Sequence, residues 1–253
     1  MTQFGFGRYA SNVTSYLSLL ERARIVPNHF TSAAYITAAG WVVDGGRVYD
    51  EAGLVFPPVC EAGMLEADGD VWVDFEGCAP RNASSEAFDR EYIYRAGAFW
   101  DLSGGAFKVL RKNVRKVEAL NPEWCVCEFA DAAQVFVDWA DTAVGRLDSL
   151  EDGELVLRYL RERGAIWGVR IGGKLAAVVA CDVNYWGVNF RYCFALDDPP
   201  YASEFARVRF YRMLEPDTLV NDGGDLGQEG LAQFKRKLRP VEVRVRRSWN
   251  AVC

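Results

Sequence analysis

A glycine-rich polar loop between an apolar run and an amphipathic segment constrains this chain most: TLVNDGGDLGQEGLAQFKRKLRP, residues 218–240. Residues 218–220 favour a β-strand, and the Asn-Asp-Gly-Gly run after them reaches backbone conformations that other residues avoid. Asp225 and Gln228 have the spacing of a capping box, which predicts that a helix begins there. That helix would bury Leu231, Phe234 and Leu238, with a basic last turn and Pro240 as its stop. A strand, a polar glycine loop and a helix often form a small-molecule site, although a plain connection is the simpler interpretation.

The composition indicates a globular protein and limits the classes of partner. The chain has 253 residues, of which 50% are hydrophobic and 13% aromatic, enough for one large domain or two small ones. Its net charge of -6 argues against a general nucleic-acid binder but leaves room for a local basic groove. No apolar run has the length of a membrane span, and the N-terminus lacks the pattern of a signal peptide. We therefore expect no membrane span and a cytoplasmic location.

The cysteine and histidine content argues against a metal site. Seven cysteines are an odd number and lie mostly in apolar runs, as reduced core thiols do. Cys125 and Cys127 share one face of a predicted strand, but a zinc site needs further ligands at matching spacing. The only histidine is His29, so catalysis driven by histidine is improbable as well. We expect no metal.

The hydrophobic periodicity predicts alternating helices and strands. Helices are expected over 14–25, 30–39, 102–120, 132–147, 154–163 and 202–214, and strands over 41–43, 47–49, 53–56, 71–75, 91–94, 124–129, 165–171, 174–182, 188–196 and 241–249. The Asp-Gly-Gly at 44–46 and the Gly-Gly at 172–173 predict hairpins. The order of elements in the second half is a fuller version of the order in the first, which suggests a duplicated unit in an α+β protein.

Several common catalytic motifs are missing. Gly168, Gly173 and Lys174 approach a phosphate-binding P-loop, but Leu175 stands where that motif needs Ser or Thr. Neither a dinucleotide-binding G-x-G-x-x-G nor a nucleophile elbow G-x-S-x-G occurs.

Two further features could bind an anion. Basic residues at Lys108, Arg111 or Lys112, and Arg115 form a stripe along the helix expected at 102–120. Such a stripe is usually a solvated face, and its functional interpretation is a surface for phosphate groups. The helix expected from residue 202 would direct free N–H groups near Tyr201 and Ser203 toward any anion there.

Two segments resemble a known family. Glu91 to Lys116 (EYIYRAGAFWDLSGGAFKVLRKNVRK) resembles the E-Y-[IL]-Y, L-S-G and K-R-N segment in the catalytic domain of lysyl-phosphatidylglycerol synthases. Asn221 to Pro240 resembles the closing N-x-x-x-D-L-G-x-x-G-L-x-x-x-K-x-x-x-x-P pattern of the same family. The resemblance implies a tandem GNAT fold, with two mixed, mostly antiparallel sheets flanked by helices and a relationship to Fem-type aminoacyl transferases. It implies halves at residues 1–100 and 101–253, with the active site in the second.

The resemblance also implies an activity, and the matched motifs, taken together with the acidic loop, the basic stripe and the helix start described above, suggest its residues. Such enzymes move an acyl or aminoacyl group from acyl-CoA or aminoacyl-tRNA to an amine or hydroxyl acceptor. Asp222 or Asp225 would accept the proton of the acceptor, and Asn221 and Lys235 would orient the donor carbonyl or its oxyanion. The donor would be bound by Arg111, Lys112, Asn113, Arg115, Tyr201, Ser203 and Gly227. The chain departs from the family where Val114 replaces a histidine and where Gly223-Gly224 replaces an acidic pair.

Two alternatives remain open. The chain could be a non-catalytic binding protein on the same fold, and side chains such as Phe205 and Tyr211 filling the cleft would favour this. It could also be a transferase that acts on an amine carried by a nucleic acid, with the helix from Lys108 to Lys116 contacting tRNA or DNA.

Overall fold

The computed structural model describes residues 10–65, 70–78, 83–142, 153–162 and 166–251. Its first elements are α1 (Ser11–Arg22), α2 (Ala33–Ala38), β1 (Val42–Asp44), β2 (Arg47–Tyr49), β3 (Val59–Cys60), β4 (Gly63–Met64) and β5 (Ala83–Arg95). After two short 3-10 turns follow α3 (Lys108–Glu118), β6 (Glu123–Cys127), α4 (Phe129–Ala140), α6 (Gly153–Glu162), β7 (Ile166–Ile171), β8 (Lys174–Val183) and β9 (Val188–Ala195). The chain ends with α7 (Ala202–Tyr211), β10 (Leu219–Asn221), α8 (Glu229–Lys237) and β11 (Glu242–Ala251).

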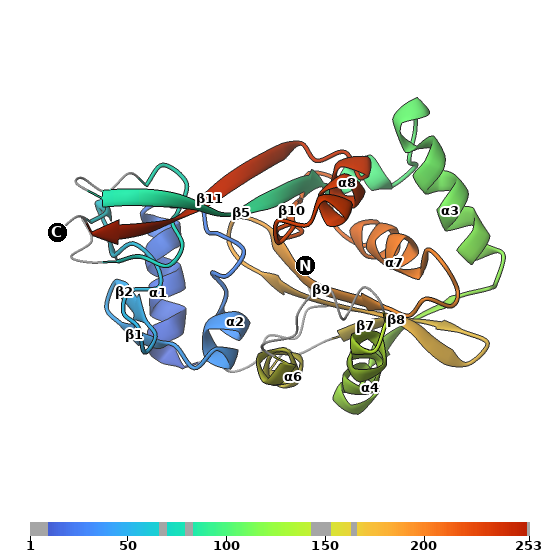
Figure 1. The fold of residues 1–253 in the computed structure, drawn as a ribbon, viewed down its shortest axis with the longest axis horizontal. Coiled ribbons are helices and arrows are strands. Elements are labelled where there is room, and N and C mark those ends of the chain that lie inside the picture. Colours follow the sequence, from blue (N-terminus) through green and yellow to red (C-terminus); the bar gives the residue numbers. More distant parts are fainter. Residues whose placement is uncertain (1–9, 66–69, 79–82, 143–152, 163–165, 252–253) are drawn as a thin grey trace.

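A seven-stranded sheet is the framework of the molecule (Figure 1). Its order is β11-β5-β10-β9-β8-β7-β6, and within the described ranges two hairpins, β1-β2 and β3-β4, form separate small sheets. Neighbouring strands of the large sheet are antiparallel except β10 and β9, which are parallel and pair over Val220–Val188 and Asn221–Asn189 alone. The expected α+β class, with mixed, mostly antiparallel strands flanked by helices, is confirmed, and the described residues form one large sheet where two were expected.

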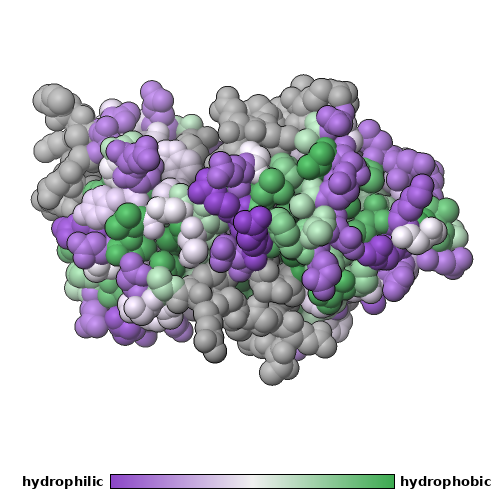
Figure 2. Space-filling view, turned by 90° about the horizontal axis from the view of Figure 1, so that it is seen from below, coloured by the Kyte–Doolittle hydropathy of each residue, from purple (hydrophilic) through white to green (hydrophobic). Residues whose placement is uncertain are grey.

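Helices cover the two faces of the sheet unequally (Figure 1). On one face, α3 and α7 pack on a core that includes Tyr94, Phe190 and Tyr211. On the other, α4, α6 and α2 pack around Phe136, Tyr159 and Phe194. A third cluster, with Tyr16 and Phe56, fills the N-terminal unit, by which we mean residues 10–78. Seen from the side of α4 and α6, the surface carries a central group of hydrophilic side chains beside an apolar region (Figure 2).

β5 joins the N-terminal unit to the rest of the fold. It lies between β11 and β10, and β5 and β11 pair over ten residue positions along the length of the molecule (Figure 1). The large sheet therefore mixes strands from before and after residue 100. The division into halves at 1–100 and 101–253 stays a prediction.

Some expected elements are shorter or begin elsewhere. The strands expected at 53–56 and 71–75 are reduced to isolated bridges at Leu54 and Val71, because Pro57 and Pro58 follow Leu54 closely and cannot donate to a ladder. The strand expected at 91–94 is instead the thirteen-residue β5. Residues 143–147 of the helix expected at 132–147 lie outside the described residues.

The helix expected from Asp225 begins four residues later, so the predicted capping box is wrong. α8 begins at Glu229, and its N-cap residue Gln228 makes no capping hydrogen bond through its side chain. Leu226 and Gly227 have φ angles of 52° and 70°, in the left-handed region that interrupts a right-handed helix.

In the described ranges, every helix is too short or too polar to cross a bilayer.

Candidate functional site

The loop 221–227 lies at the carboxyl end of β10, where the parallel strands β9 and β10 diverge. The two strands pair only at Val220–Val188 and Asn221–Asn189. β10 then ends at Asn221, whereas β9 continues to Ala195. Successive residues of a strand face opposite sides of a sheet. Asn221 thus faces the N-terminal unit, whereas Asp222 faces α7 and α8, and both are almost fully buried.

Asp222 is the centre of a buried ion cluster. Arg207 of α7 donates through Nε to its Oδ2 at 2.9 Å, and the Tyr211 hydroxyl donates to the same oxygen at 2.7 Å. Lys235 of α8 donates to the backbone carbonyl of Asp222, and its Nζ lies 3.4 Å from Oδ1. Each of the three charged side chains is at most 10% exposed.

The charges of this cluster determine its protonation. Burial acts to raise the pKa of Asp222, but the charges of Arg207 and Lys235 outweigh it and lower that pKa below its ordinary value. Burial, assisted by the charge of Arg207, lowers the pKa of Lys235. Asp222 is thus an ionised ion-pair partner, and both of its carboxylate oxygens are already occupied by Arg207, Tyr211 and Lys235.

Asp225 forms a second cluster on the same side of the loop. Its Oδ2 accepts from the Tyr92 hydroxyl at 2.6 Å and from Arg90 at 3.3 Å, and its Oδ1 accepts from the backbone N–H of Gly227 at 3.1 Å. Burial acts to raise the pKa of Asp225, but these hydrogen bonds outweigh it and lower that pKa. Asp225 and Gly227 thus stabilise the turn before α8.

The residues predicted to bind the donor lie at the other end of α7. Asn113 of α3 is buried and donates to Glu204 in the first turn of α7 at 2.8 Å. Tyr201 precedes that turn in a left-handed conformation and has Lys116 over its ring, and the carbonyl of Ser203 accepts from Cys193. Lys112 and Arg115 are exposed, and Arg111 donates to the carbonyls of Leu102 and Gly104. α7 thus links this group to Asp222 through Arg207.

A polar stripe crosses the opposite face of the sheet, beneath the N-terminal unit. It contains Asp182 of β8, Asn189 and Arg191 of β9, Asn221 of β10, Glu91 of β5, and Arg244 and Arg246 of β11. A register shift between β8 and β9 leaves Arg191 unpaired in the ladder. Such bulges re-aim a side chain, and Arg191 here lies over the rings of Phe30 and Tyr35.

The segment 28–35 of the N-terminal unit covers this stripe. The backbone N–H of His29 donates to Glu91 at 2.5 Å, and its carbonyl accepts from Arg191 at 3.1 Å. The Ser32 hydroxyl donates to Asp182 at 2.8 Å. Glu91 also forms a buried ion pair with Arg246 at 2.8 Å, with each side chain 2% exposed.

Besides one atom each of Arg244 and Arg246 on β11, four polar atoms of the stripe and of His29 have no hydrogen-bond partner among the described residues. They are Nδ1 of His29, Nδ2 of Asn189, Nδ2 of Asn221 and Nε of Arg191. A buried polar atom without a partner is rare and costs free energy, unless a ligand or a water occupies the space beside it. Asn189 and Asn221 are register partners on adjacent strands, so their amides face the same side together.

His29 is a neutral base in this arrangement. Burial lowers its pKa well below the ordinary value, and the charges of Arg191 and Lys235 lower it further. Its ring makes a hydrogen bond with the backbone of Asn221, which opposes this shift only in part. Nδ1 of this ring is buried and has no partner among the described residues.

The glycine pair of the loop makes room for two side chains from distant segments. Gly223 has a φ of 62°, and a Cβ atom there would lie 2.8 Å from Nε2 of His29. A Cβ atom on Gly224 would overlap the carboxylate of Asp89. The sequence did not point to His29 as a site residue, because 192 positions separate it from Asn221; its status as the only histidine was the one available signal.

The arrangement offers a proton acceptor and hydrogen-bond donors but no metal centre. Within the described ranges, no group of three or more His, Cys, Asp or Glu side chains could hold a metal ion. The cysteines of those ranges are all free thiols. A neutral imidazole next to amide donors is suited to proton transfer and to stabilising a developing oxyanion.

Comparison with known proteins identifies the fold. No protein-family model matches the chain, and no curated protein matches it. A conserved protein of unknown function from Bacteroides thetaiotaomicron has a similar structure, with a TM-score of 0.76, 15% identity and full coverage of both chains. The C-terminal domain of a putative lysylphosphatidylglycerol synthetase from Agrobacterium fabrum has a TM-score of 0.63 at 15% identity, covering 94% of this chain and 93% of that one.

A third similar structure is L-PGS from Bacillus licheniformis, with a TM-score of 0.61 and 13% identity, covering 98% of this chain and 94% of that one. At these identities the likeness is one of fold. The chain shares the fold of the C-terminal domain of lysylphosphatidylglycerol synthetases.

Proposed function

We propose that the protein is an acyltransferase that moves an acyl or aminoacyl group from an ester or thioester donor to an amine or hydroxyl acceptor. The observation that carries this proposal is the buried Nδ1 of His29, which has no partner among the described residues and lies over the face of the sheet that carries the unpartnered amides of Asn189 and Asn221. The shared fold with lysylphosphatidylglycerol synthetase domains supports it. The resemblance of the loop 221–240 to their closing motif supports it as well.

The groups at this site have complementary roles in the transfer. The neutral acceptor attacks the carbonyl carbon of the donor, and a new C–N or C–O bond forms as the ester or thioester bond breaks. The proton of the acceptor passes to Nδ1 of His29 and then to the departing oxygen or sulfur. The amides of Asn221 and Asn189 donate to the oxyanion that develops on the carbonyl. Asp222 acts through the ion cluster, since it keeps Lys235 and Arg207 in position beneath the loop.

The surroundings of α7 favour aminoacyl-tRNA over acyl-CoA as the donor. A pyrophosphate at the start of α7 would meet exposed Asp197 and Asp198 and the carboxylate of Glu204. Like charges at that position disfavour a compact pyrophosphate. The exposed cations of α3, among them Lys112 and Arg115, form a longer stripe suited to a polyanion.

The test combines a binding panel with a turnover assay. Thermal stability is measured with acyl-CoA, free CoA and an aminoacyl-tRNA pool, since a donor at a hundred times its Kd adds about 2.7 kcal/mol of stability. Transfer from the stabilising donor to a panel of small amines is then followed in the native protein and in His29→Gln and Asn221→Ala. We expect each variant to lose at least tenfold in rate, whereas Gln233→Ala, an exposed change on α8, leaves it unaltered. Equal rates in all four proteins contradict the proposal.

A second candidate is a non-catalytic binding protein on the same fold. Phe205 and Tyr211 are buried, and Arg207 lies against the ring of Phe190 where β9 and β10 diverge. These side chains of α7 fill the space between the helix and the sheet, at the point where β9 and β10 separate. Stabilisation by a donor without any transfer to an acceptor would favour this second candidate.

A further inference from the structure

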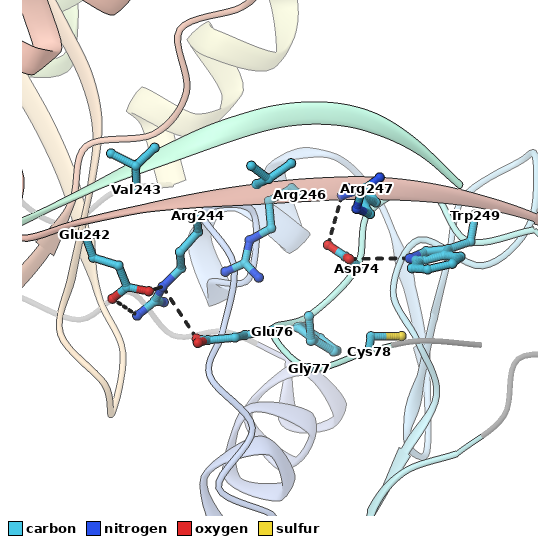
Figure 3. A pocket seen from close by; sticks show the side chains of 12 residues that line it. Asp74, Glu76, Gly77, Cys78, Glu242, Val243, Arg244, Arg246, Arg247 and Trp249 are labelled. Atoms are coloured by element: carbon cyan, nitrogen blue, oxygen red, sulfur yellow. Dashed lines mark hydrogen bonds and ion pairs between the residues drawn. The ribbon is translucent and has the colours of Figure 1, made fainter. Parts of the chain in front are cut away.

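A pocket of about 410 Å³ lies between β11 and the segment Asp74–Cys78 (Figure 3). Its walls include Glu242, Arg244 and Arg246 from one strand, and Asp74 and Glu76 from the facing segment. This volume lies in the range of small-molecule sites. The pocket borders the polar stripe, because Arg246 in its wall is paired with Glu91, whose other oxygen accepts from the backbone of His29.

Arg244 points into this pocket with a hydrogen-bond donor that is unused among the described residues (Figure 3). Its side chain is 9% exposed, and the guanidinium lies over the Trp186 ring at 4.5 Å. Nε and Nη2 donate to Glu242 at 2.6 and 2.9 Å, and Nε lies 3.5 Å from Glu76. Nη1 remains, and an oxygen acceptor on a ligand would satisfy it.

The residues that line the pocket include three carboxylates, of Asp74, Glu76 and Glu242, and three cations, of Arg244, Arg246 and Arg247. The guanidinium of Arg247 is exposed and donates to Ser85, outside the pocket, so it forms no ion pair with these carboxylates. Arg246 is already paired with Glu91, and Arg244 is shared between Glu242 and Glu76. Asp74 accepts from the backbone of Arg247 at 3.0 Å and from the Trp249 indole at 3.4 Å, so hydrogen bonds rather than a direct ion pair hold it. Arg244 is therefore the one lining cation that pairs with carboxylates of the pocket, and a ligand with a positive charge would neutralise part of the remaining negative charge. Glu76 is half-exposed, so such a ligand can reach its carboxylate.

We propose that this pocket binds a small ligand with an ammonium group next to an oxygen acceptor, the chemistry of an α-amino acid or its ester. The ammonium lies between Glu76 and Asp74, and the oxygen accepts from Nη1 of Arg244. The role of this ligand as the acceptor amine rests on the proposed function; its binding does not.

Calorimetric titration with three probes tests the binding. L-alanine carries both groups, L-alanine methyl ester keeps the ammonium and a carbonyl, and N-acetyl-L-alanine has no ammonium. We expect the first two to bind and the third to bind at least tenfold more weakly. A preference for alanine over its ester identifies a free amino acid, and the reverse preference identifies an ester. Equal binding of all three, or binding of none, overturns the proposal.

Matched variants locate the binding. Glu76→Gln removes a half-exposed carboxylate of the pocket, and we expect at least a tenfold loss of affinity for the ammonium probes. Glu86→Gln removes an exposed carboxylate of β5 outside the pocket and should leave the affinity unchanged. Equal losses in both variants count against this site.

The same titration separates this inference from the proposed function. His29→Gln should bind the probes with unchanged affinity but fail in acyl transfer. Transfer that depends on His29, without probe binding at Glu76, would contradict the pocket and leave the function standing. Probe binding without any transfer would leave the pocket standing and contradict the function.

Discussion

Gly223 and Gly224 show how two residues without side chains can build a polar site. Each leaves a space that a side chain from a distant segment enters, His29 from before α2 and Asp89 from β5. In the family that the loop resembles, an acidic pair stands at these two positions. Here the imidazole of His29 lies beside Gly223 and the carboxylate of Asp89 lies beside Gly224.

Replacing Gly223 by Ala tests the contact with His29. The φ of 62° alone costs an alanine about 1 kcal/mol, and the Cβ atom 2.8 Å from Nε2 adds a clash. Gly227→Ala is the matched control, since its φ is 70° and no atom lies within 4 Å of its Cβ. Urea unfolding should show a clearly larger loss for Gly223→Ala. Equal losses of unfolding free energy in the two variants would mean that the His29 ring can move away from the new Cβ atom at no cost in stability.

The buried His29 should make stability depend on pH. Its pKa in the folded protein is well below the value near 6.5 of the unfolded chain, so the unfolded state binds more protons on acidification. The resulting loss begins as the pH falls through about 6.5 and reaches about 1.4 kcal/mol between pH 7.5 and 5.5. Unfolding of wild type and His29→Gln at both values measures it. The His29→Gln variant should lack this part of the loss. Identical pH profiles of the two proteins would mean that His29 takes up a proton in the folded state as readily as in the unfolded chain, so that its pKa is not lowered.

At the scale of elements, α7 and α8 are joined through the end of a strand. Asp222 connects Arg207 and Tyr211 of one helix to Lys235 of the other. A buried charge that loses its partner costs far more than an exposed ion pair contributes. The position of both helices over the sheet therefore depends on this one carboxylate.

Asp222→Asn is expected to destabilise the protein by about 3–5 kcal/mol, because Arg207 and Lys235 would be left without their counter-charge. Asp217→Asn is the control: it removes an ion pair with Arg95 whose side chains are 95% and 48% exposed, which costs at most about 1 kcal/mol. Chemical denaturation of both variants gives the comparison. Similar losses would mean that the cluster contributes no more than a surface pair.

Local periodicity predicted most elements of the second half, because each strand and helix there carries its own pattern of burial. The β1-β2 and β7-β8 hairpins follow from their glycine turns. The start of α8 could not be predicted, since the capping-box spacing at Asp225 competes with left-handed residues at 226 and 227 that only the folded loop imposes. Of the candidate site, Asn221, Asp222 and Lys235 could be picked out because they lie in one stretch of sequence.

At the scale of the whole molecule, the site depends on contacts between segments that are far apart in the chain. His29 and Ser32 contact Glu91 and Asp182 of the sheet through hydrogen bonds that span 62 and 150 positions. No periodicity carries information over such separations, so the sequence could predict the loop but not the side chains that cover it. The sheet order, with β5 between β10 and β11, was beyond prediction for the same reason.

This shared sheet leads to a prediction about the two halves. If residues 1–100 and 101–253 were independent domains, each would unfold in its own transition. Because β5 pairs with β10 and β11, and Glu91 binds both His29 and Arg246, we expect one cooperative transition in calorimetry. Glu91→Gln should lower the midpoint of that single transition by several degrees, because it leaves Arg246 buried without its counter-charge. Two separate transitions, or a Glu91→Gln variant in which one half unfolds while the other keeps the wild-type midpoint, would show instead that the halves fold independently and that the polar stripe only lies between them.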